Sequence, residues 1–128
     1  MKKVLTCLVV LIIGLVSFWT WATKAESPDA IDPNEVYIFT QKTCPHCWAA
    51  EDYLKTKYPS VNFKFRDLSD DNNRALFFAC GEKFGLSKFS MGTPMFCMGT
   101  RYIMGWGSEE QEKFDLYIKD FLPQQSKP

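Results

Sequence analysis

The sequence predicts a single α/β domain in which strands and helices follow the order β-α-β-α-β-β-α. Two short apolar runs, Val36–Phe39 and Met95–Met98, are typical of central strands that are buried on both faces. Segments with helical spacing of apolar residues lie between these runs and after them. The chain has 128 residues, of which 46% are hydrophobic, so it has room for one such domain with a packed core.

The first strand is followed by a predicted helix and a second strand. We expect this helix to begin at Pro45, since proline is favoured in a first helical turn, and to run to about Tyr58, before Pro59. From Val61 to Arg66, apolar and polar residues alternate. This period of two is typical of a half-buried strand, which we place at an edge of the sheet.

The second half begins with another predicted helix, from about Asn72 to Phe84, and a loop. The apolar run Met95–Met98 then follows. Gly99-Thr100 can turn this strand into Arg101–Met104, which predicts an antiparallel hairpin.

A last helix is predicted near the C-terminus. Ser108 and Gln111 have the spacing of a capping box at its start. The residues of its apolar stripe are Phe114, Tyr117, Ile118 and Phe121. We therefore expect one domain at residues 35–122, a linker at 26–34 before it and a short tail at 123–128.

The N-terminus predicts export. Lys2-Lys3 is followed by an uncharged, largely apolar stretch at residues 4–23. Residues 1–25 are either a cleaved signal peptide or an uncleaved anchor that spans the inner membrane. Both alternatives place the domain in the periplasm or another extracytoplasmic compartment, where disulfides persist.

The charge balance argues against nucleic acid as a partner. The chain has 15 basic and 15 acidic residues, so its formal net charge is zero, and no basic patch is visible. We expect a monomer.

The most informative motif is Cys44-Pro45-His46-Cys47, directly after the first strand. At a helix start, the first thiol lies beside unpaired backbone N–H groups and the positive end of the helix dipole, which favour a thiolate. Cys47 shares the apolar face of the helix, whereas Cys44 lies at its tip. We therefore predict that Cys44 is a nucleophile, that Cys47 resolves its adducts and that His46 tunes Cys44.

Other readings of this motif are weaker. A static bridge between these two cysteines would close too short a loop to constrain an unfolded chain much. A zinc site would need further ligands, and His46 is the only histidine. We expect no metal.

Cys80 and Cys97 also lie in apolar surroundings. They are either two buried thiols, a structural disulfide or a redox relay to Cys44. The sequence leaves these three alternatives open.

Methionine and tryptophan offer two further alternatives. Thioether and thiolate ligands suit Cu(I), although methionine at such positions is ordinary core filling; the residues in question are Met91, Met95, Cys97, Met98 and Met104. Trp48 and Trp106 either border the active site as an apolar platform for substrates or pack in the core.

The order of elements, with Cys44-Pro45-His46-Cys47 after the first strand and Thr93-Pro94 before the third, resembles the thioredoxin fold in its compact, glutaredoxin-sized form. The resemblance covers about residues 35–122. It implies a four-stranded mixed sheet with helices on both faces: the motif helix and the last helix on one, the middle helix on the other. It also implies that Pro94 is cis and lies beside the cysteines, where Thr93 contacts the substrate.

The residues that indicate a subfamily point in two directions. The segment before the motif looks like glutaredoxin, in which a lysine such as Lys42 helps to bind glutathione. Pro45-His46 is similar to the dipeptide of DsbA, and Gly92-Thr93-Pro94 is similar to the loop of exported disulfide oxidoreductases. The acidic pair that glutaredoxins use for glutathione is replaced by residues 105–109, Gly-Trp-Gly-Ser-Glu.

These features predict an extracytoplasmic thiol:disulfide oxidoreductase that acts on cysteine-containing exported proteins. The expected substrate-binding residues are Lys42, Pro45, Thr93 and Pro94. We expect no cofactor beyond the redox-active disulfide Cys44–Cys47, and a membrane or periplasmic redox partner that resets it. The alternatives are a non-catalytic binding module such as a Cu(I) carrier and a glutathione-dependent glutaredoxin.

Overall fold

The computed structural model describes residues 31–123. The predicted leader at 1–25, the first part of the linker and residues 124–128 of the predicted tail lie outside this range. Within residues 31–123, no helix combines the length and the apolarity needed to cross a membrane.

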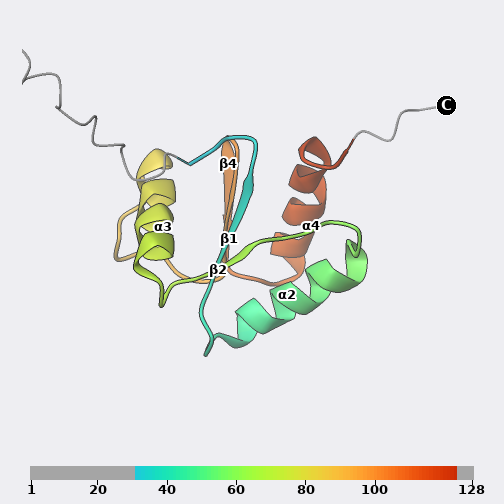
Figure 1. Cartoon of the computed structure of the whole chain (residues 1–128), viewed down its shortest axis with the longest axis horizontal. Helices are drawn as coiled ribbons and strands as arrows, with labels where there is room; N and C mark the ends of the chain where they lie inside the picture. Colours follow the sequence, from blue (N-terminus) through green and yellow to red (C-terminus); the bar gives the residue numbers. More distant parts are fainter. Residues whose placement is uncertain (1–30, 124–128) are drawn as a thin grey trace, which may run out of the picture.

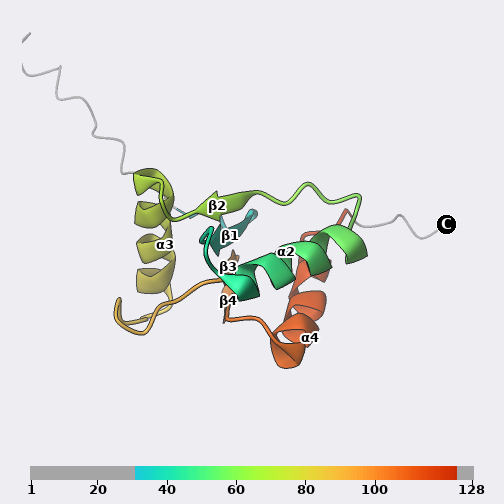
Figure 2. The same ribbon diagram turned by 90° about the horizontal axis from the view of Figure 1, so that it is seen from below.

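The core of the domain is a four-stranded mixed sheet (Figure 1), in which the strands follow the order β2-β1-β3-β4 (Figure 2). Strand β1 pairs in parallel with β2 and antiparallel with β3, and β3 pairs antiparallel with β4. The strand bounds are β1 Val36–Thr40, β2 Phe65–Asp67, β3 Met95–Met98 and β4 Arg101–Met104. The predicted α/β class and the predicted mixed sheet are confirmed, and the architecture is a thioredoxin-like fold.

Three α-helices cover the two faces of this sheet. Their bounds are α2 Pro45–Lys57, α3 Asp71–Lys83 and α4 Ser108–Tyr117. Helices α2 and α4 lie on one side of the sheet and α3 lies on the other (Figures 1 and 2). A 3₁₀ turn, Ile118–Asp120, continues α4.

The continuous apolar run of β1 supplies apolar side chains to both faces of the sheet. Ile38 packs with residues of α2 and α4, such as Leu54 and Phe114. Its neighbours Tyr37 and Phe39 belong to the cluster on the α3 side. Because successive side chains of a strand point to opposite faces, a central strand with two covered faces has to be apolar at every position.

Strand β2 begins later than the alternating pattern predicted. Only Phe65 to Asp67 pair with β1. The N–H of Phe63 donates to the carbonyl of Val61 at 3.1 Å, so the backbone turns locally here instead of joining the ladder. The ring of Phe63 still packs edge-on against Phe114, and this burial explains the alternation without a strand.

The predicted capping box of the last helix is wrong. Gly107 is the N-cap of α4, and no side chain caps this helix. Ser108 is instead the first helical residue, and the N–H of Gln111 donates to the carbonyl of Gly107 at 3.0 Å. The N-cap therefore lies one residue earlier than the spacing of Ser108 and Gln111 predicts.

The register of the two central strands sets the position of the site. Phe39 near the end of β1 pairs with Met95 at the start of β3. The loop that leaves β1 towards Cys44 and the loop that brings Thr93 into β3 therefore meet at the same end of the sheet. Residues 49 positions apart in the sequence become neighbours in this way.

Candidate active site

Cys44 is the N-cap residue of helix α2. Its backbone is extended, with φ −100° and ψ 106°, and its sulfur accepts a hydrogen bond from the N–H of Cys47 at 3.2 Å. Pro45 occupies the first turn, where its lack of an N–H costs nothing. The Cys44 sulfur thus caps the positive end of a 13-residue helix, as the motif predicted.

The two cysteines have different environments. Cys44 is partly exposed, whereas Cys47 is buried, with 2% of its surface exposed. Burial raises the pKa of Cys44, but hydrogen bonds with Cys47 and Thr93 and with the N–H of His46 outweigh it, so the net pKa is lowered. Burial, followed by the hydrogen bond with Cys44, raises the pKa of Cys47 to about 11. One thiol is therefore suited to attack and the other is held protonated.

The loop before β3 lies against the Cys44 sulfur. The Cys44 thiol contacts the carbonyl oxygen of Thr93 at 3.6 Å, and the Thr93–Pro94 peptide bond is cis, as the resemblance implied. The Thr93 hydroxyl donates to the side chain of Gln41 at 3.4 Å. On the other side, the N–H of Gly105 donates to the carbonyl of Pro94 at 2.8 Å. Hydrogen bonds thus connect the loop to Gln41, which precedes the motif, and to Gly105, which follows β4.

The remaining predicted site residues surround the motif. Pro45, His46 and Lys42 are all exposed. It is the backbone N–H of His46 that bonds to the Cys44 sulfur, so the role of its imidazole stays a prediction. The carbonyl of Lys42 accepts a hydrogen bond from the indole N–H of Trp48 at 3.1 Å.

Cys80 and Cys97 are joined by a disulfide, with their Cα atoms 6.3 Å apart. Both residues are fully buried, and the bond ties α3 to β3 on the face opposite α2. Of the three alternatives that the sequence left open, the structure contains the bridge. Because its sulfur is bonded to Cys80, Cys97 has no thiolate to offer to Cu(I).

The methionines mostly fill the core. Met95 and Met98 are buried in the clusters on opposite faces of the sheet. The Met91 side chain occupies the space that a Cβ would take at Gly81, so this glycine lets the loop pack closely on α3. The Met104 sulfur accepts a hydrogen bond from the N–H of Gly92 at 3.1 Å. Among the described residues, no group of three or more His, Cys, Asp or Glu side chains could hold a metal ion.

Sequence reasoning missed one residue that helps to position α2. Asp115 of α4 accepts hydrogen bonds from Tyr53 at 2.7 Å and Tyr58 at 2.6 Å, and it forms an ion pair with Lys57. Burial raises the pKa of Asp115, but the bonds from Lys57, Tyr58 and Tyr53 outweigh it and lower the net pKa. A single acidic residue in an amphipathic helix gives no sequence signal for this cluster.

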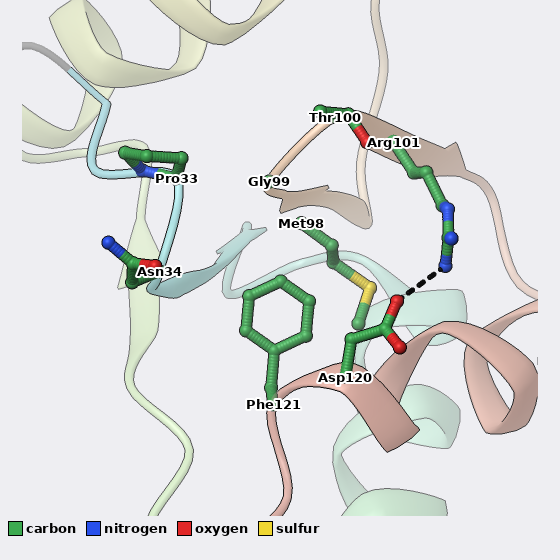
Figure 3. Close-up of a pocket in the computed structure, with 8 residues that line it drawn as sticks. All are labelled: Pro33, Asn34, Met98, Gly99, Thr100, Arg101, Asp120 and Phe121. Atoms are coloured by element: carbon green, nitrogen blue, oxygen red, sulfur yellow. Dashed lines mark hydrogen bonds and ion pairs between the residues drawn. The ribbon is translucent and has the colours of Figure 1, made fainter.

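A cavity of about 410 Å³ lies at the opposite end of the sheet from the cysteines (Figure 3). It is lined by the turn after β3 and by residues around Phe121, and the Arg101–Asp120 ion pair at 2.9 Å borders it. Met98 pairs with Val36 at the start of β1, whereas the cysteine motif follows the end of β1. The length of strand β1 therefore separates this cavity from Cys44.

The fold and the paired cysteines define a thioredoxin-like domain with a dithiol at the start of its first described helix. Residues 36–77 match the glutaredoxin family model. This segment runs from β1 through the cysteine motif and α2 into α3, and the match supports a redox function of the thioredoxin superfamily. No curated protein matches the chain.

Proposed function

We propose that this protein is an extracytoplasmic thiol:disulfide oxidoreductase that exchanges disulfides with the cysteines of exported proteins. The observation that carries the proposal is that the two thiols of the motif differ in exposure and in pKa. Cys44 is accessible and has a lowered pKa, whereas Cys47 is buried with a pKa of about 11. A nucleophile has to be a thiolate that a substrate can reach, and only Cys44 meets both conditions.

The reaction takes place in two exchange steps. The Cys44 thiolate attacks one sulfur of a substrate disulfide, a mixed disulfide forms, and the other substrate sulfur leaves as a thiolate that takes up a proton. Cys47 then loses its proton and attacks the Cys44 sulfur, so the second substrate thiol leaves and the Cys44–Cys47 disulfide forms. Two electrons pass from the protein to the substrate, and the reverse sequence oxidises a dithiol. Thr93 and Pro94 position the substrate at the Cys44 sulfur.

The leader supports the proposed extracytoplasmic location. Lys2-Lys3 and the uncharged run at residues 4–23 are typical of a signal peptide or an anchor in the inner membrane. In such a compartment a membrane or periplasmic redox partner would return the Cys44–Cys47 pair to its starting state.

A glutathione-dependent glutaredoxin is the second candidate. The family match to residues 36–77 favours it, and Lys42 lies within the matched segment. The match ends before Thr93 and before residues 105–109, where the expected acidic pair is replaced.

The test is the reduction potential of the Cys44–Cys47 pair, measured on the full-length chain in glutathione redox buffers by quantifying alkylated thiols. We expect one reversible two-electron transition. A potential of about −120 mV would assign a DsbA-like oxidant, and one of about −270 mV a thioredoxin-like reductant. If Cys44 and Cys47 form no disulfide with each other at any buffer ratio, the proposal is wrong.

A further inference from the structure

Trp48 exposes a large apolar ring directly beside the cysteine motif. Its side chain is 58% exposed, although it follows buried Cys47 on helix α2. Among residues 31–123, the other exposed large apolar side chains are Phe89, Tyr102 and Leu116. Neither α2 nor the motif segment holds any of these three.

One hydrogen bond orients the Trp48 ring, and a second holds its backbone. Its indole N–H donates to the carbonyl of Lys42 at 3.1 Å, and its backbone N–H donates to the carbonyl of Cys44 at 3.2 Å. Lys42 precedes the motif and Trp48 follows it, so the indole bond spans the motif from one end to the other.

This bond holds the ring against the segment that leads into the motif. Residues four apart on a helix are neighbours on its surface, with Cβ atoms about 5–6 Å apart. Trp48 is four residues after Cys44, and helical side chains lean back towards the preceding turn. Cys47, one residue earlier, points into the core instead. Helix α2 therefore has the Cys47 thiol on its buried side and the Trp48 indole on its exposed side, both within four residues of Cys44.

A ring that is exposed and already immobilised is well suited to contact a partner. It can bury apolar area on binding and loses little side-chain freedom when it does so. Tryptophan is accordingly enriched among the residues that dominate binding energies.

We propose that Trp48 is a specificity-determining residue that packs against an apolar side chain next to the reacting cysteine of a peptide substrate. Glutathione has no such side chain beside its cysteine, so the ring favours polypeptide disulfides over glutathione disulfide. This inference rests on the proposed exchange chemistry at Cys44. It names the substrate class of that same site.

Two substitutions distinguish the contribution of the aromatic ring from that of its hydrogen bond. Trp48→Phe keeps an aromatic ring but has no N–H, whereas Trp48→Gln keeps an N–H donor but has no ring. Leu116→Ala is the matched control, because Leu116 is also 58% exposed but lies on α4. Folding of each full-length variant is checked by circular dichroism and thermal unfolding.

The reduced proteins are mixed with three symmetric disulfides, and the released thiols are quantified after acid quenching. Two are short peptides that differ only in the residue after the cysteine, Phe in one and Ser in the other, and the third is glutathione disulfide. We expect Trp48→Gln to lower the rate constant for the Phe peptide about tenfold, with changes within about twofold for the other two substrates. Trp48→Phe and Leu116→Ala should retain the preference for the Phe peptide.

The opposite pattern overturns the inference. If Trp48→Phe slows all three disulfides equally and Trp48→Gln slows none, the indole serves only to hold the motif through Lys42. Equal rates of the wild-type protein with the two peptides also contradict it, while leaving the exchange chemistry intact. A wild-type protein that releases no thiol from any of the disulfides overturns the proposed function itself.

Discussion

The backbone N–H of Cys47 donates a hydrogen bond to the sulfur of Cys44, with the two atoms 3.2 Å apart. In the proposed exchange, the residue that resolves the adduct would thus also stabilise the attacking thiolate. The hydrogen bond with Cys44 and the charge of Cys44 both help to raise the pKa of Cys47, after the larger effect of burial. Once Cys44 enters a mixed disulfide it has no charge, so the pKa of Cys47 should fall when its thiolate is needed.

The pH dependence of alkylation should separate the two thiols. We expect the rate of Cys44 modification by iodoacetamide in the reduced protein to rise with an inflection below the ordinary cysteine pKa of about 8.5. As long as Cys44 is not yet alkylated, Cys47 should remain unmodified until the pH reaches about 11, because burial raises its pKa, so both rates are measured at low extents of reaction. Mass spectrometry of the alkylated peptides measures both residues in one experiment.

Two variants identify the source of this shift. Cys47→Ala removes a side-chain hydrogen bond that lowers the pKa of Cys44, so the inflection should move up. His46→Ala keeps the backbone N–H, so any further rise measures the imidazole alone. An inflection of the wild-type protein at or above 8.5 would contradict a thiolate-stabilising site.

Asp115 should stabilise the fold by joining α4 to α2. Asp115→Ala removes the acceptor of Tyr53 and Tyr58, and we expect it to lower the free energy of unfolding by about 1–2 kcal/mol at pH 7. The folded-state pKa of this carboxyl is lowered, so its contribution is present above about pH 4, the unfolded-state value, and is lost as the pH falls through the folded-state value. Urea unfolding should therefore show that the difference in free energy of unfolding between the wild-type protein and Asp115→Ala shrinks as the pH falls from 5 to 2.

Asp120→Ala is the matched control for this prediction. Asp120 also pairs with a cation, Arg101, but its side chain is 63% exposed. Solvent screens such pairs, so its removal should change the free energy of unfolding by less than about 0.5 kcal/mol. Equal effects of the two substitutions would show that the Asp115 cluster has no special role.

The Cys80–Cys97 disulfide should be structural. The cysteines are 17 residues apart, and a closed loop of this size is expected to contribute about 3 kcal/mol. Because both sulfurs are buried, dithiothreitol should reduce Cys44–Cys47 in the native protein well before this bond. Alkylation in two pulses, before and after unfolding, distinguishes the pairs. Reduction of both bonds at the same rate would indicate a relay instead.

The sequence predicted those features that depend on local patterns. The apolar runs of β1 and β3 and the thiols at the start of α2 follow from residue type and spacing alone. Thr93 was assigned to the site through the family resemblance, and the pairing of Phe39 with Met95 gives the physical reason for its position.

The features that the sequence did not predict depend on contacts between distant residues. The alternation at residues 61–66 reflects burial of Phe63 on Phe114 and not strand pairing. The Asp115 cluster depends on how α4 packs against α2. The local sequence pattern of neither helix indicates this packing. The orientation of Trp48 is a local exception: it depends on the carbonyl of Lys42, six residues earlier, and no residue pattern indicates this side-chain bond.

The most direct test of the two-step exchange is to trap its intermediate. Reduced full-length Cys47→Ser protein is mixed with a symmetric peptide disulfide, and the adduct is mapped by mass spectrometry. We expect one peptide to be held stably on Cys44, with one thiol released per chain, whereas the wild-type protein releases two. Reduced Cys44→Ser protein should form no adduct at Cys47 on the same timescale. Adduct formation at Cys47 in that variant, or release of both thiols by Cys47→Ser at the wild-type rate, would contradict the assigned roles.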